Sequence, residues 1–370
     1  MLFRLFLMLS ILYRYQCQIY AQDLSLVALL PTSINESSGL IHLNGKLITH
    51  LDSDNPNALF EIDTTDGTII RTVYITNASN IDWEDICYDD DFIYIGDFGN
   101  NSGSRTNLRI YKVAILDYLT STNDSILADT LSYSYSNQVD FTSGSNNTNF
   151  DAEAMISFGD SLYIFSKNWL NNTCDIYALS KNPGNSSIAK IDSFNSEGLI
   201  TGASYLNSSN ELFLCGYGPP IPFVIQINNF TGFPLSANQI NHQMVQVPTG
   251  SSVQIEAITH KDSETLYISS ETSVLGSSAL FTLQKSSLVG LHDIQKSIRT
   301  LYPNPSTSIL HVDKHIDEYI ELYNAGGQLI SSTFKSSFST TFLDPGFYQV
   351  LIRDSKHHII SRKSLIIKDQ

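Results

Sequence analysis

Residues 82–86 read Asp-Trp-Glu-Asp-Ile and residues 151–155 read Asp-Ala-Glu-Ala-Met, and these two stretches decide the fold. Weaker copies of the same phrase surround Glu36, Thr201 and Glu256. Each copy leads through a turn into a segment rich in Tyr, Ile, Phe and Leu, and then into further short apolar segments. Short alternating segments separated by turn residues indicate strands, and their regular recurrence indicates an array of one repeated unit.

We interpret the five copies as the inner strands of an all-β fold, a five-bladed β-propeller over residues 23–290. The fifth unit lacks its fourth strand, and Leu24–Leu30 precedes the first unit without a unit of its own. Pairing this segment with the last blade would close the ring and cover two sheet edges. A six-bladed ring is the alternative, with the extra blade within Ala114–Asn149, because this interval between copies is the longest.

The whole chain has a net charge of −16, and its acidic residues are concentrated in the first 290 positions, which hold 12 Lys and Arg against 29 Asp and Glu. An acidic body repels phosphate, so we expect no nucleic-acid partner. The same charge is compatible with cation binding, but charge alone favours the simpler interpretation that acidity serves only solubility.

The N-terminus has the pattern of a secretory signal peptide over residues 1–21. Arg4 precedes an apolar stretch from Leu5 to Leu12, and the small residue Ala21 provides a cleavage position. No later apolar run approaches the roughly 20 residues that span a bilayer. We therefore expect a secreted mature chain without a transmembrane segment.

The composition changes after a linker at residues 291–300. Residues 301–370 form a compact series of short apolar segments, with turn residues at Asn324–Gly327 and Asp344–Gly346. This predicts a small antiparallel, Ig-like β-sandwich of the size of a separate domain.

Four stretches of this module, LYPNPSTSILHV, ELYNAGGQLI, LDPGFYQVLI and KSLIIK, resemble the C-terminal sorting domain of the type IX secretion system of Bacteroidetes. The resemblance implies that residues 301–370 contact the type IX secretion machinery. It also implies removal of the signal peptide on Sec export, and a product that is secreted or attached to the outer-membrane surface. An Ig-like adhesion module is the alternative interpretation.

Aligning the five phrases places one polar residue of each inner strand at the same position, facing the axial channel. These residues are Glu36, Glu84, Glu153, Thr201 and Glu256. Two like charges about 6 Å apart repel by roughly 3 kcal/mol at an effective dielectric near 20, so protons or a cation must compensate the ring. Calcium fits a set of oxygen ligands better than zinc does. The alternative is that each Glu bonds the backbone of the neighbouring blade.

The segments NESSGLIHLNGKLI, DWEDICYDDDFIYIG, DAEAMISFGDSLYIF, ITGASYLNSSNELFL and VQIEAI resemble, in order, the blade openings of the calcium-activated nucleotidases, or apyrases. They also resemble uncharacterised bacterial propellers. The nucleotidase resemblance implies a five-bladed ring with one central calcium. The ligands that it implies are Asn35, Glu36, Glu84, Glu153, Thr201 and Glu256.

A second set of residues follows the second strand of each unit and is expected at one mouth of the channel, where propellers bind ligands. It comprises Asp52, Asp97, Lys167, Tyr217 and Glu271. The Gly/Asn-rich loop that follows Asp97 adds Asn100 and Arg105, so Arg105, Lys167 and Asn100 are the candidates for holding a phosphate or a sugar. A solvated hairpin loop is the alternative interpretation of that loop.

These observations leave three hypotheses for function, and they assign no catalytic residue. The first is a propeller that binds an extracellular ligand, such as a glycan, a peptide or an envelope component, with a central calcium. The second is a calcium-dependent hydrolase of phosphate esters or nucleotides that acts near Glu84, Asp97 and Arg105. The third is a glycosidase that uses paired carboxylates.

Overall fold

The computed structural model describes residues 22–218, 222–248, 254–272, 277–285, 300–314, 318–324, 329–353 and 359–368. The chain divides into two compact units, Met1–Leu288 and Val289–Gln370, and each is described by itself. The predicted signal peptide and most of the predicted linker lie outside the described residues. Among the residues described, no helix has the length and apolar character needed to cross a membrane.

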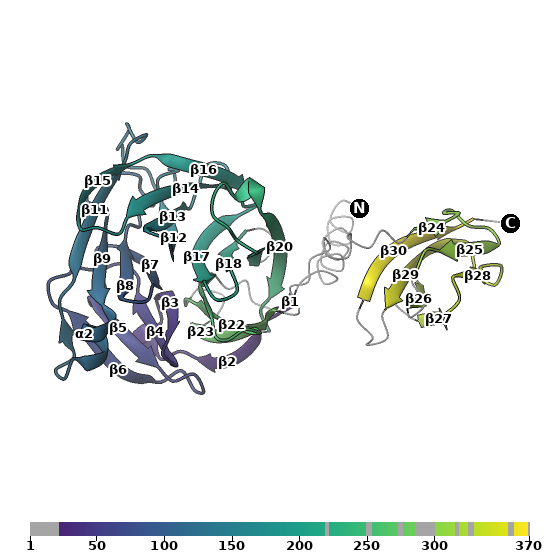
Figure 1. Cartoon of the computed structure of the whole chain (residues 1–370), viewed down its shortest axis with the longest axis horizontal. Helices are drawn as coiled ribbons and strands as arrows, with labels where there is room; N and C mark the ends of the chain where they lie inside the picture. The colour runs from purple at the N-terminus through teal and green to yellow at the C-terminus, as the bar shows by residue number, and fades with distance from the viewer. Residues whose placement is uncertain are drawn as a thin grey trace, which may run out of the picture. The chain divides into compact units, whose positions relative to one another are not determined.

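The first unit contains five sheets arranged as the blades of a propeller (Figure 1). Blade one contains β3 (Ser37–Leu43), β4 (Lys46–Leu51), β5 (Ala58–Ile62), β6 (Ile69–Ile75) and β10 (Ser125–Ile126). Blade two contains β7 (Trp83–Tyr88), β8 (Phe92–Asp97), β9 (Arg109–Ala114), β11 (Asp129–Tyr135) and β15 (Gly184–Ile188). Blade three contains β12 (Ala152–Phe158), β13 (Ser161–Ser166), β14 (Thr173–Ser180) and β16 (Lys190–Asn195).

Blade four contains β17 (Leu199–Leu206), β18 (Glu211–Tyr217), β19 (Phe223–Asn228), β20 (Gln239–Gln246) and β1 (Gln22–Asp23). Blade five contains β21 (Ile255–His260), β22 (Thr265–Ser270), β23 (Ala279–Gln284) and β2 (Ser25–Leu29). The first strands of the blades contact one another in the cyclic order β3, β7, β12, β17, β21, and therefore line the axis. Two short 3-10 turns, η1 (Thr32–Ile34) and η2 (Leu235–Ala237), complete the unit.

The N-terminal strand closes the ring, as the sequence predicts. Strand β2 pairs antiparallel with β23, with Ser25 opposite Thr282 and Leu29 opposite Ala279. The six-bladed alternative is wrong, because the interval assigned to the extra blade contains only the helix α2 (Ile115–Thr120), β10 and β11. Of these strands, β10 joins blade one and β11 is the fourth strand of blade two.

Three blades carry a short extra strand on their outer edge, and each of these pairs parallel to its neighbour. Strand β10 covers β6, β15 crosses from blade three to cover β11, and β1 covers β20. An uncovered edge presents unpaired N–H and C=O groups to other chains, so these additions protect the ring from edge-to-edge association.

The blades pack through apolar side chains that alternate along the strands. Trp83 is fully buried between blades one and two, with its ring edge-on to that of His50. The described cysteines, Cys87, Cys174 and Cys215, are buried and unpaired. They therefore act as small apolar residues of the core, as expected for isolated cysteines in strands.

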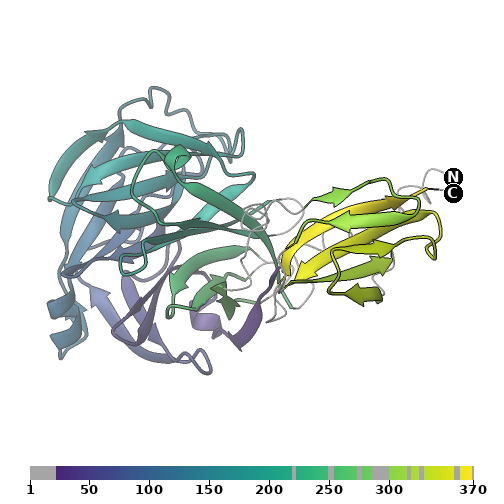
Figure 2. The same cartoon turned by 45° about the vertical axis from the view of Figure 1, so that its right-hand side comes forward.

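The second unit is a sandwich of two antiparallel sheets, whose strands are visible side by side in Figure 2. One sheet contains β24 (Leu301–Tyr302), β25 (Ile309–Val312) and β28 (Ser337–Ser339). The other contains β26 (Tyr319–Asn324), β27 (Leu329–Thr333), β29 (Gly346–Arg353) and β30 (Ile359–Ile367). Buried residues of both sheets, among them Leu310, Ile320 and Val350, form its core, which agrees with the predicted small β-sandwich.

Candidate functional site

A β-bulge recurs at the same place in every inner strand, and it positions the polar ring. In β7, Trp83 pairs with Asp97 and Asp85 pairs with Gly96, so Glu84 has no partner across the sheet. The pairing skips Glu153, Thr201 and Glu256 in the same way. Because a bulge redirects a side chain out of the regular alternation, it explains how these residues turn toward the axis.

The predicted equivalence of Glu36 with this ring is wrong. In β3 the pairing jumps from Ser37–Leu51 to Leu40–Thr49, so Ser38 occupies the position of Glu84. The bulge of β3 spans two residues instead of one, and local sequence similarity does not reveal this. The exposed side chain of Glu36 instead accepts a hydrogen bond from Asn55 Nδ2 at 2.6 Å.

The hydroxyl members of the ring link neighbouring inner strands. Ser38 Oγ donates to the carbonyl of Glu84 at 2.6 Å, and Thr201 Oγ1 donates to the carbonyl of Ile255 at 2.7 Å. The main-chain carbonyl of Asn35 accepts from the N–H of Thr272 at 2.9 Å. For Ser38 and Thr201, the geometry matches the interpretation that ring residues join adjacent blades.

Lys167 places an ammonium group beside one part of the ring. Its Nζ lies 2.5 Å from Glu153 Oε2, and only 4% of the Lys167 side chain is exposed. The same Nζ lies 4.8 Å from the ring centroid of Trp169 and 4.9 Å from that of Tyr217. Desolvation lowers the pKa of Lys167, but the charges of Glu153, Tyr217 and Glu256 outweigh it and raise that pKa well above its usual value. Its surroundings therefore favour the charged ammonium form of Lys167.

Three further carboxylates gather at the channel mouth. Oxygens of Asp52, Asp82 and Glu84 all lie within 4.8 Å of one another. The residue Glu84 is 9% exposed, and none of the described residues donates a hydrogen bond to its carboxylate. The nearest guanidinium atom of Arg105 lies 4.0 Å from Asp82 Oδ2.

The electrostatics of this cluster favour the uptake of a cation or of protons. Desolvation, and then the charge of Asp52, raise the pKa of Asp82 to about 7. Desolvation, and then the charges of Glu153 and Asp52, raise the pKa of Glu84 well above its usual value. Gly99 lies against both carboxylates, and a Cβ atom there would overlap Glu84 Oε1 and Asp82 Oδ2. The absence of a side chain at this position is what leaves room for the cluster.

The loop after β8 supports the site with donors that are already in use. Arg105 Nη2 lies 2.8 Å from Asp97 Oδ1, and Arg105 Nη1 donates to the carbonyl of Gly99 at 2.7 Å. Asn100 donates through its side chain to the carbonyl of Phe150 at 3.0 Å and accepts from the N–H of Arg105 at 2.9 Å. Arg105 and Asn100 thus shape the loop.

Four members of the second predicted set share one register position, because each directly follows the second-strand residue that pairs just before the bulge. They are Asp52, Lys167, Tyr217 and Glu271, of which Tyr217 is still part of β18 and pairs with Leu199. In blade two Asp97 still pairs with Trp83, so Phe98 takes the equivalent place, and the alignment of Asp97 is wrong by one residue. The pKa of Glu271 is raised by desolvation and then by the charge of Asp52, which agrees with a shared acidic mouth.

The predicted site residues do not include Asp82 and Asp151, although both open a copy of the repeated phrase two residues before its Glu. The recurrence of Asp at this place in both copies was the sequence pattern that could have identified the two residues. Asp151 is fully buried, and it accepts hydrogen bonds from the N–H of Asn100 at 2.6 Å and from Trp169 Nε1 at 2.7 Å. Asp151 is therefore satisfied by the protein, whereas Asp82 faces the unpaired Glu84.

Sequence reasoning also missed Asp85, which lies inside the channel and is 1% exposed. Its Oδ2 accepts hydrogen bonds from the N–H of Met155 at 2.7 Å and of Ala203 at 3.3 Å, and its Oδ1 accepts from the N–H of Ile86 at 2.8 Å. Desolvation raises the pKa of Asp85, and these backbone donors oppose the rise. One carboxylate thus joins blades two, three and four below the acidic mouth.

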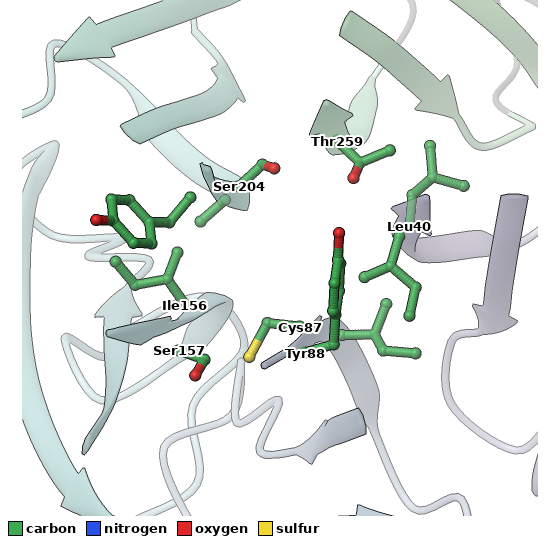
Figure 3. A pocket seen from close by; sticks show the side chains of 11 residues that line it. Leu40, Cys87, Tyr88, Ile156, Ser157, Ser204 and Thr259 are labelled. Carbon is green, nitrogen blue, oxygen red and sulfur yellow. The ribbon is translucent and has the colours of Figure 1, made fainter. Parts of the chain in front are cut away.

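A small pocket occupies the opposite end of the inner strands (Figure 3). Its lining includes Leu40, Cys87, Tyr88, Ser157 and Thr259, and the described lining contains no charged side chain. Figure 3 shows the hydroxyl groups of Tyr88 and Thr259 pointing toward each other. We call this region the neutral end of the channel, and the region around Asp52, Asp82, Glu84, Glu153 and Glu256 the acidic mouth.

Comparison with known proteins identifies the second unit. Residues 300–368 match the model of the secretion system C-terminal sorting domain. The C-terminal unit belongs to this family. A sorting domain of this kind directs export by the type IX secretion system, so the chain is a cargo of that machinery and contacts it through this domain. No curated protein is similar in sequence to the chain.

Solved structures similar to the chain include several propeller enzymes. One is an α-L-arabinofuranosidase from Podospora anserina in complex with cellotriose, with 10% identity, a TM-score of 0.41, and coverage of 72% of this chain and 96% of that one. Another is a GH43_1 enzyme from Xanthomonas citri complexed with xylotriose, with 8% identity, a TM-score of 0.41, and coverage of 70% and 89%. A third is the GH93 α-L-arabinofuranosidase of Fusarium graminearum with arabinobiose, with 10% identity, a TM-score of 0.40, and coverage of 72% and 98%.

Proposed function

We propose that the exported propeller binds an extracellular ligand, a glycan, a peptide or an envelope component, at its acidic mouth, with a calcium ion held by Asp52, Asp82 and Glu84. In this proposal the mature protein is secreted or remains attached to the outer-membrane surface. The observation that carries it is the Glu84 carboxylate, which is buried beside two further carboxylates without a donor among the described residues. A buried carboxylate of this kind is costly unless a cation or a proton compensates it.

The donor set fits calcium. Asp52, Asp82 and Glu84 offer hard oxygen atoms, and calcium accepts about 6 to 8 of these in adaptable geometry. Three carboxylates leave coordination positions for water or for hydroxyl and carbonyl oxygens of a ligand. When bound, the ion would supply positive charge and open coordination positions at the mouth. The three residues would hold and orient it, and Gly99 would keep their oxygens close together.

The side chains of the acidic mouth fit the binding of a ligand better than they fit the hydrolysis of phosphate esters or nucleotides. Arg105 and Asn100 are engaged within their own loop, and Lys167 is paired with Glu153. Among the described residues of the mouth, no cationic side chain is therefore available for a phosphate group, which would also meet the surrounding carboxylates. A calcium-dependent hydrolase of phosphate esters or nucleotides would have to rely on the metal alone.

Thermal unfolding of the purified protein with calcium and then with a chelator tests the cation site. We expect the chelator to lower Tm by several degrees, because a ligand that binds only the folded state stabilises it. Glu84→Gln should abolish the response to calcium. The matched control is Glu61→Gln, since Glu61 is a buried carboxylate paired with Lys46 at 2.8 Å outside the channel. That variant should be destabilised and still respond to calcium. Identical wild-type melts in both conditions would refute the site.

Two assays with the same protein distinguish the functions. Binding to an array of glycans and peptides, in calcium and in chelator, should show retention that is lost in Glu84→Gln. Phosphate release from a broad panel of nucleotides and phosphomonoesters should stay at background. Calcium-dependent phosphate release that disappears in Glu84→Gln would replace the binding proposal with the hydrolase.

A further inference from the structure

The chain contains two tryptophans, and they occupy opposite environments. Trp83 is fully buried and belongs to the apolar cluster between blades one and two. Trp169 lies in the loop after β13, remains partly exposed, and belongs to none of the apolar clusters that the described residues of the propeller form. Burial in the core therefore explains the position of Trp83 but not that of Trp169.

Polar contacts hold the indole of Trp169 in place instead. Its Nε1 donates to Oδ2 of the fully buried Asp151 at 2.7 Å, and its main-chain N–H donates to the carbonyl of Thr148 at 3.1 Å. The ammonium group of Lys167 lies over the indole, 4.8 Å from the ring centroid. An aromatic side chain that is anchored before a ligand arrives loses little further conformational freedom on binding, so more of the contact energy contributes to affinity. Trp169 is thus preorganised for contact with a ligand.

Short contacts connect this indole with the acidic mouth. The same Asp151 carboxylate accepts a second hydrogen bond, at 2.6 Å, through Oδ1 from the N–H of Asn100. Asn100 directly follows Gly99, and Gly99 lies against Glu84 Oε1 and Asp82 Oδ2. One buried carboxylate therefore joins the backbone beside the proposed cation site to the indole of blade three.

A neutral sugar matches the chemistry that meets here. Its ring carries weakly positive C–H groups on each face, which the electron-rich face of an indole attracts. Its edge carries neutral hydroxyl groups, which offer oxygen ligands to calcium. A charged peptide fits less well, because an anionic side chain would face the carboxylates of the mouth and a cationic one would face the calcium ion and Lys167.

We propose that Trp169 is the stacking platform for a neutral sugar residue of a glycan bound at the acidic mouth. The inference rests on the proposed function and deepens it, since it names a glycan as the ligand. The calcium ion would coordinate hydroxyl groups at the edge of the sugar, while the indole contacts one of its faces. Trp169 therefore selects the ligand, and the carboxylates hold the ion.

Tryptophan fluorescence of the purified protein provides the test, because the buried Trp83 is shielded from a dissolved quencher and Trp169 is not. The probes are neutral oligosaccharides of glucose, mannose, galactose, xylose and arabinose, titrated in calcium. At least one of them should shift the emission to shorter wavelength and reduce quenching by acrylamide. In calorimetric titration the same oligosaccharide should bind about tenfold more weakly to Trp169→Ala, with a smaller loss in Trp169→Phe, which keeps an aromatic face.

Tyr74 provides the control variant. It is also an exposed aromatic residue, but it lies on β6, toward the outer edge of blade one. Tyr74→Ala should bind the oligosaccharide with wild-type affinity. The rise of Tm with calcium should persist in Trp169→Ala, which would show that this variant is folded and that its cation site is intact.

The outcomes distinguish the inference from the proposed function. If calcium raises Tm but no oligosaccharide alters the emission or the quenching of Trp169, the inference is overturned and the cation site stands. Binding of a peptide that leaves Trp169 open to acrylamide would also overturn the inference, while the binding function stands. If an oligosaccharide shields Trp169 equally in calcium and in chelator, the inference holds and the proposed calcium ion fails. Unchanged affinity in a folded Trp169→Ala overturns the inference, whatever the wild type binds.

Discussion

The two ends of the channel are built from the same five inner strands, yet their chemistry is opposite. At the acidic mouth each strand carries a β-bulge, and the bulged residues include Glu84, Glu153 and Glu256. At the neutral end the strands pair regularly, and the lining consists of apolar and hydroxyl side chains such as Leu40, Ser157 and Thr259. The comparison shows that an irregularity repeated in every blade gives one end of a regular scaffold positions for inward-turned side chains, and that charge gathers there together with Asp52 and Asp82, which lie outside the bulges.

Asp85 lies between these two regions, and its removal should have the largest effect on the free energy of unfolding. Asp85→Ala leaves three buried N–H groups, from three blades, without an acceptor. We expect a loss of about 3 to 5 kcal/mol in the free energy of unfolding, measured by urea denaturation. Asp85→Asn, whose amide oxygen still accepts, should lose less. A loss in Asp85→Ala below about 1 kcal/mol would show that the two ends are not joined through this residue.

The acidic mouth should respond to pH. Burial raises the pKa of Asp82 from its usual 3.8 to about 7, so the folded protein keeps a proton that the unfolded chain releases at lower pH. This stabilisation is complete below pH 4 and is lost as the pH rises through 7. After calcium removal, the free energy of unfolding, measured by urea denaturation, should fall by up to about 4 kcal/mol between pH 4 and pH 8. Asp82→Asn should flatten that profile. An unchanged slope in this variant would assign the titration to other groups.

A smaller effect, on calcium affinity, should follow from filling the space next to the carboxylates of Glu84 and Asp82. Gly99→Ala adds a methyl group that overlaps Glu84 Oε1 and Asp82 Oδ2, both of which end flexible side chains. We expect these carboxylates to move apart and calcium affinity to fall about tenfold in a calorimetric titration, with little change in Tm in chelator. Unchanged affinity would show that the ion is bound elsewhere.

The smallest effect is expected at the neutral end. Cys87 lines the pocket and is 8% exposed, with no disulfide. Cys87→Ser keeps its size, so we expect a loss of at most about 1 kcal/mol in urea unfolding. The shift of Tm by calcium should match that of wild type. An altered calcium response would mean that the two ends are coupled through the channel.

The fold was more predictable than the site. The repeated phrase and the unpartnered segment Leu24–Leu30 predicted five blades and the closing strand correctly, because both depend on patterns that extend over whole strands. The crossing of β15 from blade three to blade two was not predictable, since neither strand length nor polarity specifies which edge a short segment will cover.

The errors in the site have one physical source, which is the pairing register. A two-residue bulge in β3 displaced Glu36 from the ring, and continued pairing of Asp97 with Trp83 displaced Asp97 from the mouth. Lys167 was predicted at the mouth, but its ion pair with Glu153 depends on side-chain direction, which the sequence does not specify. Whether calcium binds, as the sequence suggests, stays a prediction.

The closing pair of strands also has a consequence for biosynthesis. Strand β2 begins at Ser25, and its partner β23 ends at Gln284, so the two edges that complete the ring come from opposite ends of the unit. During translation β2 remains unpaired until β23, the last described strand of the propeller in the sequence, has emerged from the ribosome. A propeller built in this order cannot close its ring before β23 has been made, so ring closure is one of the last steps in the assembly of a polypeptide destined for export.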